Sequence, residues 1–538
     1  MRVLFQGAFY RSRASADSEI TMSLAYIVLI ILLIVYVPIW FWAWRRPDAA
    51  ARWHLQKYGP CLMIRTQLGM KTMDRFARYP RFWHAFGFAS KLVSAILFLL
   101  MMYMLIVAVI ALPARLSSGS SIGIEYALAI PGFNPIMPLS YGVVALVIAM
   151  VVHELGHGIQ ARVNGMRVDS SGLLYGVVPL GAFVEPNEED LEKAPRKAQL
   201  DVYAAGITVN TIVAILSIFV MIGACGCVSS DYGDNAGAFY IDSDSPSYDA
   251  GIPASALIIS VKESGTDAYV PVSAISSGTA AYLDYAFDPT KTYDIIYRDS
   301  GGEHIVGDVR MGAYIKALTA GGPADSAGLK LDSFIYSIDG HVLGGPGEFM
   351  DFMASTIPGQ TVSIVTVDRS GSLSEPVCVL LESKGSNGFL GVTVTTGGMT
   401  FTTPNILLEK AVNPFYGAEG AYGHVQSFFS YLSGPFNGMD PISDDVKWWY
   451  DVPIGDIFWM FITLMYWLFW LDILLAISNA LPTYILDGGF IFAGGVNWLL
   501  EKLKVAEDRR EKLTQNIAGS VSSVTLFLFM LVILAMVI

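Results

Sequence analysis

Six long apolar segments are the feature that most limits how this chain can fold. They lie at about 22–44, 92–113, 138–160, 200–228, 457–481 and 517–538, and each is long enough to cross a lipid bilayer as a helix. The composition agrees, because 53% of the 538 residues are hydrophobic and only 15% are charged. The sequence therefore predicts a polytopic α-helical membrane protein with about six transmembrane helices.

The charges between these segments predict an orientation. Lys and Arg are frequent in residues 45–91, 161–199 and 502–512, whereas the loop 114–137 contains Arg115 as its one basic residue. The positive-inside rule places the basic stretches in the cytoplasm. The N-terminus, the C-terminus and residues 229–452 are then expected on the extracytoplasmic side.

The chain divides by composition into further parts. Residues 1–21 are polar and expected to be disordered, and Leu4-Phe5-Gln6-Gly7 resembles the remnant of a cleavable expression tag. Residues 22–91 are expected to form the first transmembrane helix and a basic cytoplasmic interfacial loop. Residues 92–228 contain transmembrane helices 2–4, and residues 453–538 contain helices 5–6.

An internal repeat organises the polar middle of the chain. Residues 245–261 recur as residues 322–338 at a constant offset of 77, and each copy follows a phrase that begins with Gly, at Gly237 and Gly312. Such a repeat indicates a duplicated small domain. The sequence predicts two mainly β copies at 229–311 and 312–400, followed by an extracytoplasmic linker at 401–452.

The third apolar segment contains the pattern H-E-x-x-H, as His153-Glu154-Leu155-Gly156-His157. On an α-helix, two residues four positions apart lie on the same face, so both imidazoles can bind one ion. A carboxylate beside the first His is the signature of a zinc metalloprotease. By the predicted orientation, this pair lies near the cytoplasmic end of its helix.

Two His residues leave a catalytic zinc site one protein ligand short. Asp487, which precedes Gly488-Gly489 at the cytoplasmic end of the fifth span, is the favoured third ligand because a carboxylate at membrane depth needs a metal or a partner. The rival ligands that remain open are Glu185, Glu188 and Glu189. Asp472 is expected to be a paired structural acid or a water-channel residue.

Residues 172–186 form an apolar run that is punctuated by Gly and too short to span as a helix. We expect a re-entrant β-hairpin, with a surface loop as the alternative. Asn210 and Asn479 are polar residues inside apolar spans, where they can bind the substrate backbone or, alternatively, join helices by hydrogen bonds.

Together these motifs resemble the site-2 protease family of intramembrane zinc metalloproteases. The similarity includes H-E-x-x-H at His153, G-x-x-x-N at Gly206 and N-x-x-P-x-x-x-L-D-G at Asn479, and it extends over most of the chain beyond the first 90 residues. Both repeat copies resemble PDZ domains, although a merely structural spacer is the alternative. Two copies and the lack of a Cys-rich luminal insert differ from some members of the family.

The resemblance implies one Zn²⁺ held by His153, His157 and Asp487, with Glu154 as general base. The substrate is expected to be a transmembrane protein in the lipid bilayer, whose helix unwinds and pairs with the 172–186 segment at Val177 and Val178. The PDZ-like copies could accept peptide termini. Nothing in the sequence suggests nucleic-acid binding.

A different class of function is a PDZ-bearing membrane scaffold or chaperone with a non-catalytic metal site. Glu154 argues against it, because a structural zinc site has no need of that carboxylate and is normally closed by four ligands. A metal transporter would need further ionisable residues along several spans. The sequence has few of these beyond Asp472.

Overall fold

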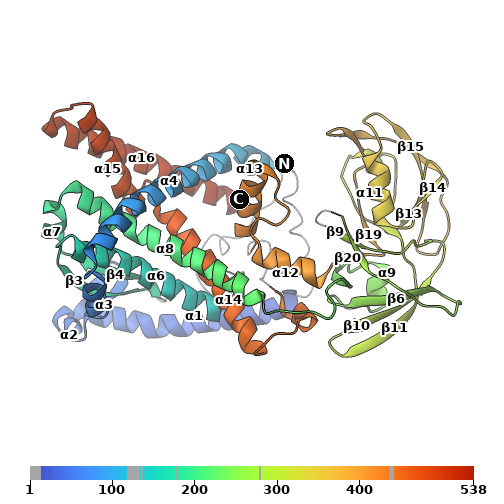
Figure 1. Ribbon diagram of the computed structural model, residues 1–538, viewed down its shortest axis with the longest axis horizontal. Coiled ribbons are helices and arrows are strands. Elements are labelled where there is room, and N and C mark those ends of the chain that lie inside the picture. The colour runs from blue at the N-terminus through green and yellow to red at the C-terminus, as the bar shows by residue number, and fades with distance from the viewer. Residues whose placement is uncertain are drawn as a thin grey trace. The chain divides into compact units, whose positions relative to one another are not determined.

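The computed structural model describes residues 14–117, 134, 137–176, 179–277, 280–434 and 442–537. The chain forms a helical unit, Arg13–Gly223 with Trp459–Ile538, and a β-rich unit, Ala224–Phe458 (Figure 1). The β-rich unit thus interrupts the helical unit in sequence. It contains the predicted repeat.

The helices of the helical unit follow the predicted apolar segments, with short helices between them. They are α1 (Ala14–Arg45), α2 (Pro47–Ala51), α3 (Met70–Phe76), α4 (Pro80–Ser117), α6 (Leu139–Val163), α7 (Glu188–Lys193), α8 (Arg196–Cys225), α14 (Asp456–Asn479), α15 (Asp487–Lys502) and α16 (Glu507–Val537).

Five of these helices, α4, α6, α8, α14 and α16, are long and apolar enough to cross a membrane. The apolar part of α1 within the described residues, Ile30–Arg45, is shorter, so the first predicted span stays a prediction. Helix α1 begins at Ala14, eight residues before the predicted start of the first span, and the rest of the expected disordered segment lies outside the described residues.

A four-stranded antiparallel sheet completes the helical unit. Its order is β1 (Leu55–Tyr58), β2 (Cys61–Thr66), β3 (Val168–Tyr175) and β4 (Pro179–Pro186). The predicted hairpin is therefore present as β3 and β4, and it begins at Val168 rather than Gly172. The sequence did not predict β1 and β2, which cover the edge of β3 and leave β4 as an outer strand.

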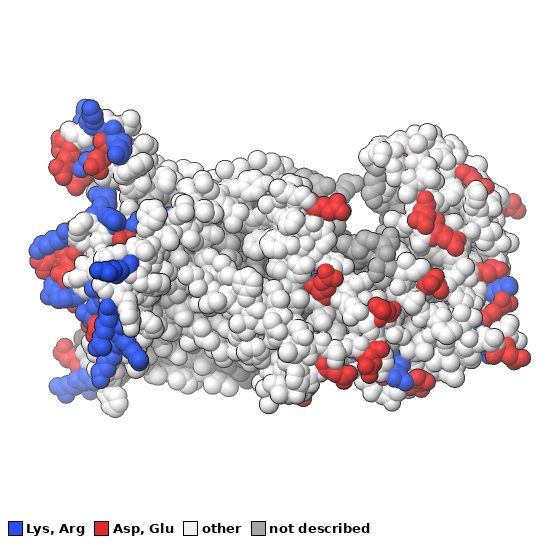
Figure 2. Space-filling view, viewed as in Figure 1, with Lys and Arg blue, Asp and Glu red and all other residues white. Residues whose placement is uncertain are grey.

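The two units of the chain differ in net charge. Residues 224–458 contain 10 Lys and Arg against 28 Asp and Glu, a balance of -18, so the rest of the chain has 24 against 19, a balance of +5. Figure 2 shows Lys and Arg gathered at the end of the helical unit that carries α3, α7 and the turn between α15 and α16. These basic loops therefore meet at one end of the helical unit.

The β-rich unit contains a 14-stranded antiparallel sheet, a separate two-stranded sheet and short helices. Its strands are β5 (Ala236–Ile241), β6 (Leu257–Glu263), β7 (Val270–Pro271), β8 (Ala274–Ser277), β9 (Ala280–Leu283), β10 (Tyr293–Asp299), β11 (Gly302–Val309), β12 (Ala313–Leu318), β13 (Phe334–Ile338), β14 (His341–Val342), β15 (Thr361–Val367), β16 (Val377–Leu380), β17 (Glu382–Lys384), β18 (Asn387–Phe389), β19 (Val392–Thr396) and β20 (Met399–Thr402). Its helices are α9 (Pro246–Asp249), α10 (Pro323–Ser326), α11 (Pro346–Ala354), α12 (Pro404–Val412), α13 (Gly420–Leu432) and η2 (Asp444–Trp449).

The repeated sequence forms the same element in each copy: a strand, a short helix that begins with Pro, and a second strand. These are β5-α9-β6 and β12-α10-β13. Pro suits the first turn of a helix because its missing N–H would have no partner there. Ser245 caps α9 by accepting a hydrogen bond from the backbone of Tyr248, and each copy has its own apolar core.

The second copy is nested within the first. Strand β19 pairs with β12 of the second copy, and the chain then turns at Gly397-Gly398 into β20, which pairs with β5 of the first copy. The first copy is thus β5–β11 together with β20, and the second is β12–β19. This differs from the predicted boundary, which placed the two copies one after the other.

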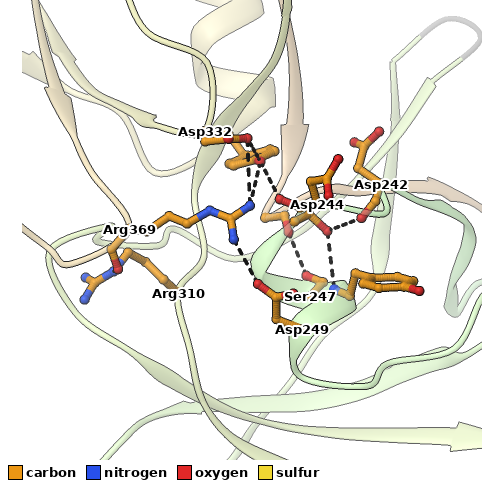
Figure 3. A network of polar contacts seen from close by, with 11 residues as sticks. Asp242, Asp244, Ser247, Asp249, Arg310, Asp332 and Arg369 are labelled. Carbon is orange, nitrogen blue, oxygen red and sulfur yellow. Dashed lines mark hydrogen bonds and ion pairs between the residues drawn. The ribbon is translucent and has the colours of Figure 1, made fainter.

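A polar network joins the two copies (Figure 3). The Arg369 guanidinium after β15 donates to Asp249 at the end of α9, over 2.8 Å. The hydroxyl of Tyr314 lies 2.6 Å from Asp332 and 3.3 Å from Nη2 of Arg369. Burial, followed by the neighbouring Asp332, raises the pKa of Tyr314, so this phenol keeps its proton at neutral pH.

Residues 401–452, predicted as a linker, contain ordered structure throughout their described part. Helix α12 follows β20 directly, and α13 and η2 come next. The indole of Trp449 donates to the carbonyl of Ser255 over 2.9 Å and lies against Gly237, where a Cβ would come within 2.3 Å of the ring. This segment therefore packs on the first copy.

Candidate metal centre

Helix α6 places His153 and His157 on one buried face, with exposed fractions of 7% and 8%. Their ring centroids are 4.7 Å apart. The Nε2 atoms of His153 and His157 lie 3.1 and 3.3 Å from the same carboxylate oxygen, Oδ2 of Asp487. The structure thus brings the two histidines together with Asp487, which lies more than 300 positions further along the sequence.

Asp487 is positioned by the sharp connection between α14 and α15. Pro482 cannot donate a backbone hydrogen bond, and α14 ends at Asn479. The chain then turns so tightly that a Cβ on Gly488 would lie 2.3 Å from the carbonyl of Leu481. Glycine at this position therefore allows Asp487 to begin α15 facing α6.

Helix α8 packs against the two histidines and contacts them through Val202 and Gly206. Nδ1 of His157 lies 2.8 Å from the carbonyl oxygen of Val202, so Nδ1 carries the proton and donates it, which leaves Nε2 as a lone-pair donor. Gly206 lies one turn further along α8. A Cβ there would come within 2.5 Å of Nε2 of His157 and within 2.8 Å of Cε1 of His153.

These atoms fit a bound zinc ion. Two imidazole nitrogens and one carboxylate oxygen are the donor set of a catalytic zinc site. Although both Nε2 atoms lie within 3.3 Å of Oδ2 of Asp487, that oxygen is buried and has no geometrically acceptable hydrogen-bond partner among the described residues. The three atoms are close enough together to bind one ion, and no hydrogen bond occupies Oδ2 of Asp487 among the described residues.

Glu154 lies beside this centre and contacts the hairpin. One of its carboxylate oxygens lies within 4.8 Å of a ring nitrogen of His153 and of His157. Its Oε2 accepts a hydrogen bond from the backbone N–H of Val184 over 2.8 Å. The N–H of Val184 therefore points away from β3, and β4 presents its outer edge to Glu154.

The direction of the other backbone groups of β4 follows from the geometry of an antiparallel sheet. Backbone groups point alternately toward and away from the neighbouring strand. Because Val184 points outward and the pairing with β3 is regular from Gly181 to Glu185, Ala182 also directs its N–H and C=O outward. The outer edge of β4 thus offers backbone hydrogen-bonding groups next to Glu154.

The rival acids have other partners or lie in solvent. Glu185 pairs with Arg65 over 2.8 Å and accepts from the Ser170 hydroxyl over 2.6 Å. Glu189 pairs with Lys193, and Glu188 is exposed. None of them contacts the histidines in the described structure.

The other predicted residues differ in their burial and in their hydrogen-bond partners. Asn210 is fully buried, and neither of its amide atoms has a partner among the described residues. Asn479 donates to the carbonyl of Leu475 over 3.0 Å, within its own helix. Val177 and Val178 lie outside the described residues. Asp472 is fully buried, and within the described structure neither carboxylate oxygen has a partner.

Sequence reasoning missed the backbone groups at this site. The carbonyl of Val202 and the N–H of Val184 have no side-chain signature, so no residue pattern could have indicated them. The strand β2 did have a signal: Cys61–Thr66 is an unbroken run of strand-compatible residues just after Gly59-Pro60, a turn signal.

Comparison with known proteins identifies a family for this chain. The family model of peptidase family M50 matches residues 141–529, which are 389 of the 538 residues and include all three clustered side chains. An uncharacterized protein of Methanocaldococcus jannaschii is 34% identical over 167 residues, 31% of this chain and 44% of that protein. A membrane-bound transcription factor site-2 protease homolog of Arabidopsis thaliana is 29% identical over 98 residues, 17% of this chain and 19% of that protein. The matched part is thus less than half the length of either relative.

Proposed function

The chain belongs to peptidase family M50, and from that premise we propose that it is an intramembrane zinc metalloprotease that hydrolyses peptide bonds within or near transmembrane helices of other membrane proteins. One observation carries the proposal. His153, His157 and Asp487 converge beside Glu154 on helices that are apolar enough to lie in a membrane.

In this proposal, His153, His157 and Asp487 hold one zinc ion. The ion would supply a Lewis acid that activates water and polarises the scissile carbonyl. Glu154 accepts the proton from the attacking water and later delivers it to the leaving amide nitrogen. The hydrogen bond from Val184 fixes the carboxylate of Glu154 in position for both transfers.

The substrate has to be unwound before it can be cut, because a helical amide is tied into its own hydrogen bonds. We place the unwound stretch along the outer edge of β4, where Ala182 offers its N–H and C=O. Val177 and Val178, predicted to bind substrate, precede β4 in the same segment. An added strand would restore hydrogen bonds that the substrate helix has lost.

Asn210 and Asn479 are proposed to bind the substrate backbone or the developing oxyanion. The support is strongest for Asn210, because neither atom of its buried amide has a hydrogen-bond partner among the described residues. Such a group destabilises the fold unless another molecule, such as the substrate, supplies the hydrogen bond. Asn479 already donates to its own helix, but its carbonyl oxygen stays available as an acceptor.

The membrane topology of the proposal follows the charges. Six spans place the N-terminus, the β-rich unit and the C-terminus outside the cytoplasm, with the metal centre near the cytoplasmic face. The gathering of Lys and Arg at one end of the helical unit supports this orientation. The PDZ-like copies would then act as a size filter or as a sensor of a newly exposed carboxyl terminus.

The test is cleavage of a single-span reporter protein by the purified chain in detergent, next to Glu154→Gln and a chelator-treated sample. We expect cutting by the wild type alone, with zinc retained in Glu154→Gln. A wild type with full zinc occupancy that leaves a panel of helix-destabilised reporters intact would favour a scaffold or chaperone instead.

A further inference from the structure

The hairpin β1-β2 lies outside the part of the chain that the family model matches. That match begins at residue 141, whereas β2 ends at Thr66. Strand β2 nevertheless pairs with β3 in a regular register, from Leu62 opposite Tyr175 to Thr66 opposite Ser171. The hairpin is therefore part of the same sheet as β4, the strand that contacts Glu154.

A side chain of this hairpin reaches across β3 to β4. Nη2 of Arg65 on β2 donates to Oε1 of Glu185 on β4 over 2.8 Å. The hydroxyl of Ser170 on β3 donates to Oε2 of the same carboxylate over 2.6 Å. One carboxylate thus joins three strands through side chains, in addition to the backbone pairing.

Gly172 leaves room for these side chains on β3. Arg65 lies opposite Gly172, and Gly172 lies opposite Phe183 of β4. Residues directly opposite one another on antiparallel strands place their side chains on the same face of the sheet. A Cβ on Gly172 would lie 1.9 Å from the carbonyl oxygen of Ile64 and 2.7 Å from the ring of Phe183. Glycine therefore lets side chains from both neighbouring strands extend over β3.

Val184 lies next to Glu185 in the sequence, and its side chain points to the other face of the sheet, because side chains alternate along a strand. It packs on α6, where a Cβ on Gly158 would lie 3.0 Å from Cγ1 of Val184. The N–H of Val184 donates to Glu154 of the same helix. Two adjacent residues thus fix β4, Val184 to α6 and Glu185 to β2 and β3.

Helix α1 holds the turn of the hairpin β1-β2. The hydroxyl of Tyr36 lies 2.7 Å from the carbonyl oxygen of Pro60 in that turn and 3.3 Å from the carbonyl oxygen of Tyr175 at the end of β3. The indole of Trp40 donates to the carbonyl of Gly59 over 3.3 Å. The strand that carries Arg65 is therefore anchored at its start by α1 and along its length by β3.

We propose that Arg65 is a positioning residue for proteolysis: by holding Glu185 it fixes β4, so that the N–H of Val184 keeps the carboxylate of Glu154 in place beside the two histidines. Arginine suits this task because its guanidinium is always charged and donates in a fixed geometry. A shift of about 1 Å in a catalytic group can slow a reaction about 100-fold, so a small movement of β4 is enough to matter. The role in proteolysis rests on the proposed function.

The exposure of this ion pair makes the inference testable. The side chains of Arg65 and Glu185 are 41% and 39% exposed. Ion pairs that are this accessible to solvent contribute little to the stability of a protein. Replacing Arg65 should therefore loosen β4 locally without unfolding the helical unit.

The test uses the full-length chain in detergent and has two readouts. Hydrogen exchange at the amide of Val184 reports its bond to Glu154 and needs no cleavage. The kcat and KM for the single-span reporter, measured together with zinc content, report the reaction. Arg65→Gln removes the charge, Arg65→Lys keeps a cation for Glu185, and Arg75→Gln removes the same charge from an exposed position on α3.

For Arg65→Gln we expect exchange at Val184 to accelerate about tenfold and kcat to fall about tenfold, with KM and zinc content within about twofold of the wild type. Arg65→Lys should recover most of both losses, and Arg75→Gln should show neither. Ser170→Ala removes the second partner of Glu185 and should change the same two readouts in the same direction. It also serves as the test if Arg65→Gln does not fold.

Exchange at Val184 that stays at the wild-type rate in Arg65→Gln and Ser170→Ala would overturn the proposal. A loss of kcat with an equal loss of zinc would also overturn it, because the metal ligands rather than Glu154 would then have moved. A wild type that leaves the reporter intact would contradict the proposed function, whereas exchange at Val184 tests the contact in either case.

Discussion

Val184 donates its backbone N–H to Oε2 of Glu154 over 2.8 Å, which joins the outer edge of β4 to the carboxylate beside the two histidines. A strand that pairs with this edge is therefore aligned with the proposed base by the same element that holds the base. In the proposed mechanism, substrate binding at β4 and proton transfer by Glu154 would be coupled through the backbone of Val184.

Replacing Ala182 with Pro tests the role of this edge. The N–H of Ala182 points outward, so its loss should leave the pairing of β4 with β3 intact while it removes a hydrogen bond to the substrate. We expect reporter cleavage to fall at least tenfold with zinc content unchanged, and Ala182→Ser to cleave normally. The same outcome is expected for Pro at Val177 or Val178. Normal cleavage by Ala182→Pro would remove β4 from the mechanism.

Replacing Asp487 with Ala should release the metal. Both histidine Nε2 atoms face Oδ2 of this residue, and two His ligands alone bind zinc weakly. We expect the zinc content of the purified protein, measured by elemental analysis, to fall at least tenfold. Glu185→Gln is the comparison, since Arg65 and Ser170 already engage that carboxylate. Zinc lost from Glu185→Gln and kept by Asp487→Ala would reverse the assignment.

Gly206→Ala should damage the centre through sterics alone. The added methyl would lie 2.5 Å from Nε2 of His157 and force the ring to move. Gly223→Ala is a matched change on the same helix with nothing within 4 Å of the new Cβ. We expect zinc content and cleavage to fall at least tenfold for Gly206→Ala, and to stay at the wild-type level for Gly223→Ala.

Tyr314→Phe should loosen the contact between the two repeat copies. It removes the hydroxyl that donates to the backbone carbonyl of Asp244 in the first copy over 3.1 Å, at a ring that is only 2% exposed. A lost hydrogen bond of this kind costs about 1 kcal/mol. Amide exchange in β12 and β13 should therefore accelerate about fivefold. Tyr248→Phe, at a ring that is 54% exposed, should leave these rates unchanged, and equal rates in both variants would show that the network is not stabilising.

The sequence predicted those parts of the site that depend on side chains with strong chemistry. The spacing of His153 and His157 follows from helical geometry, and the orientation rule placed Asp487 at the same end of the helical unit. The hairpin was predictable because Gly residues punctuate an apolar run. The family match over residues 141–529 confirms the assignment to the site-2 protease family.

The features that sequence reasoning missed depend on backbone contacts between distant segments. Residues 55–66 lie within the basic loop predicted for residues 45–91, yet they form β1 and β2, and the backbone of β2 pairs with β3. The pairing of β5 with β20 joins residues about 160 positions apart, and no local pattern marks it. Such contacts could be predicted only from the three-dimensional fold, because the fold and not the composition of a strand determines which strand lies beside it.

The nested order of the two copies also sets a sequence of events during synthesis. A ribosome releases β5 early, but the strand that pairs with it, β20, follows only after the whole second copy has emerged. Folding usually proceeds from the N-terminal domain onward. Here the later copy has all its strands by Thr396, while the earlier one must wait for Met399–Thr402. The second copy can therefore pair all its strands before the first copy receives its last strand, β20.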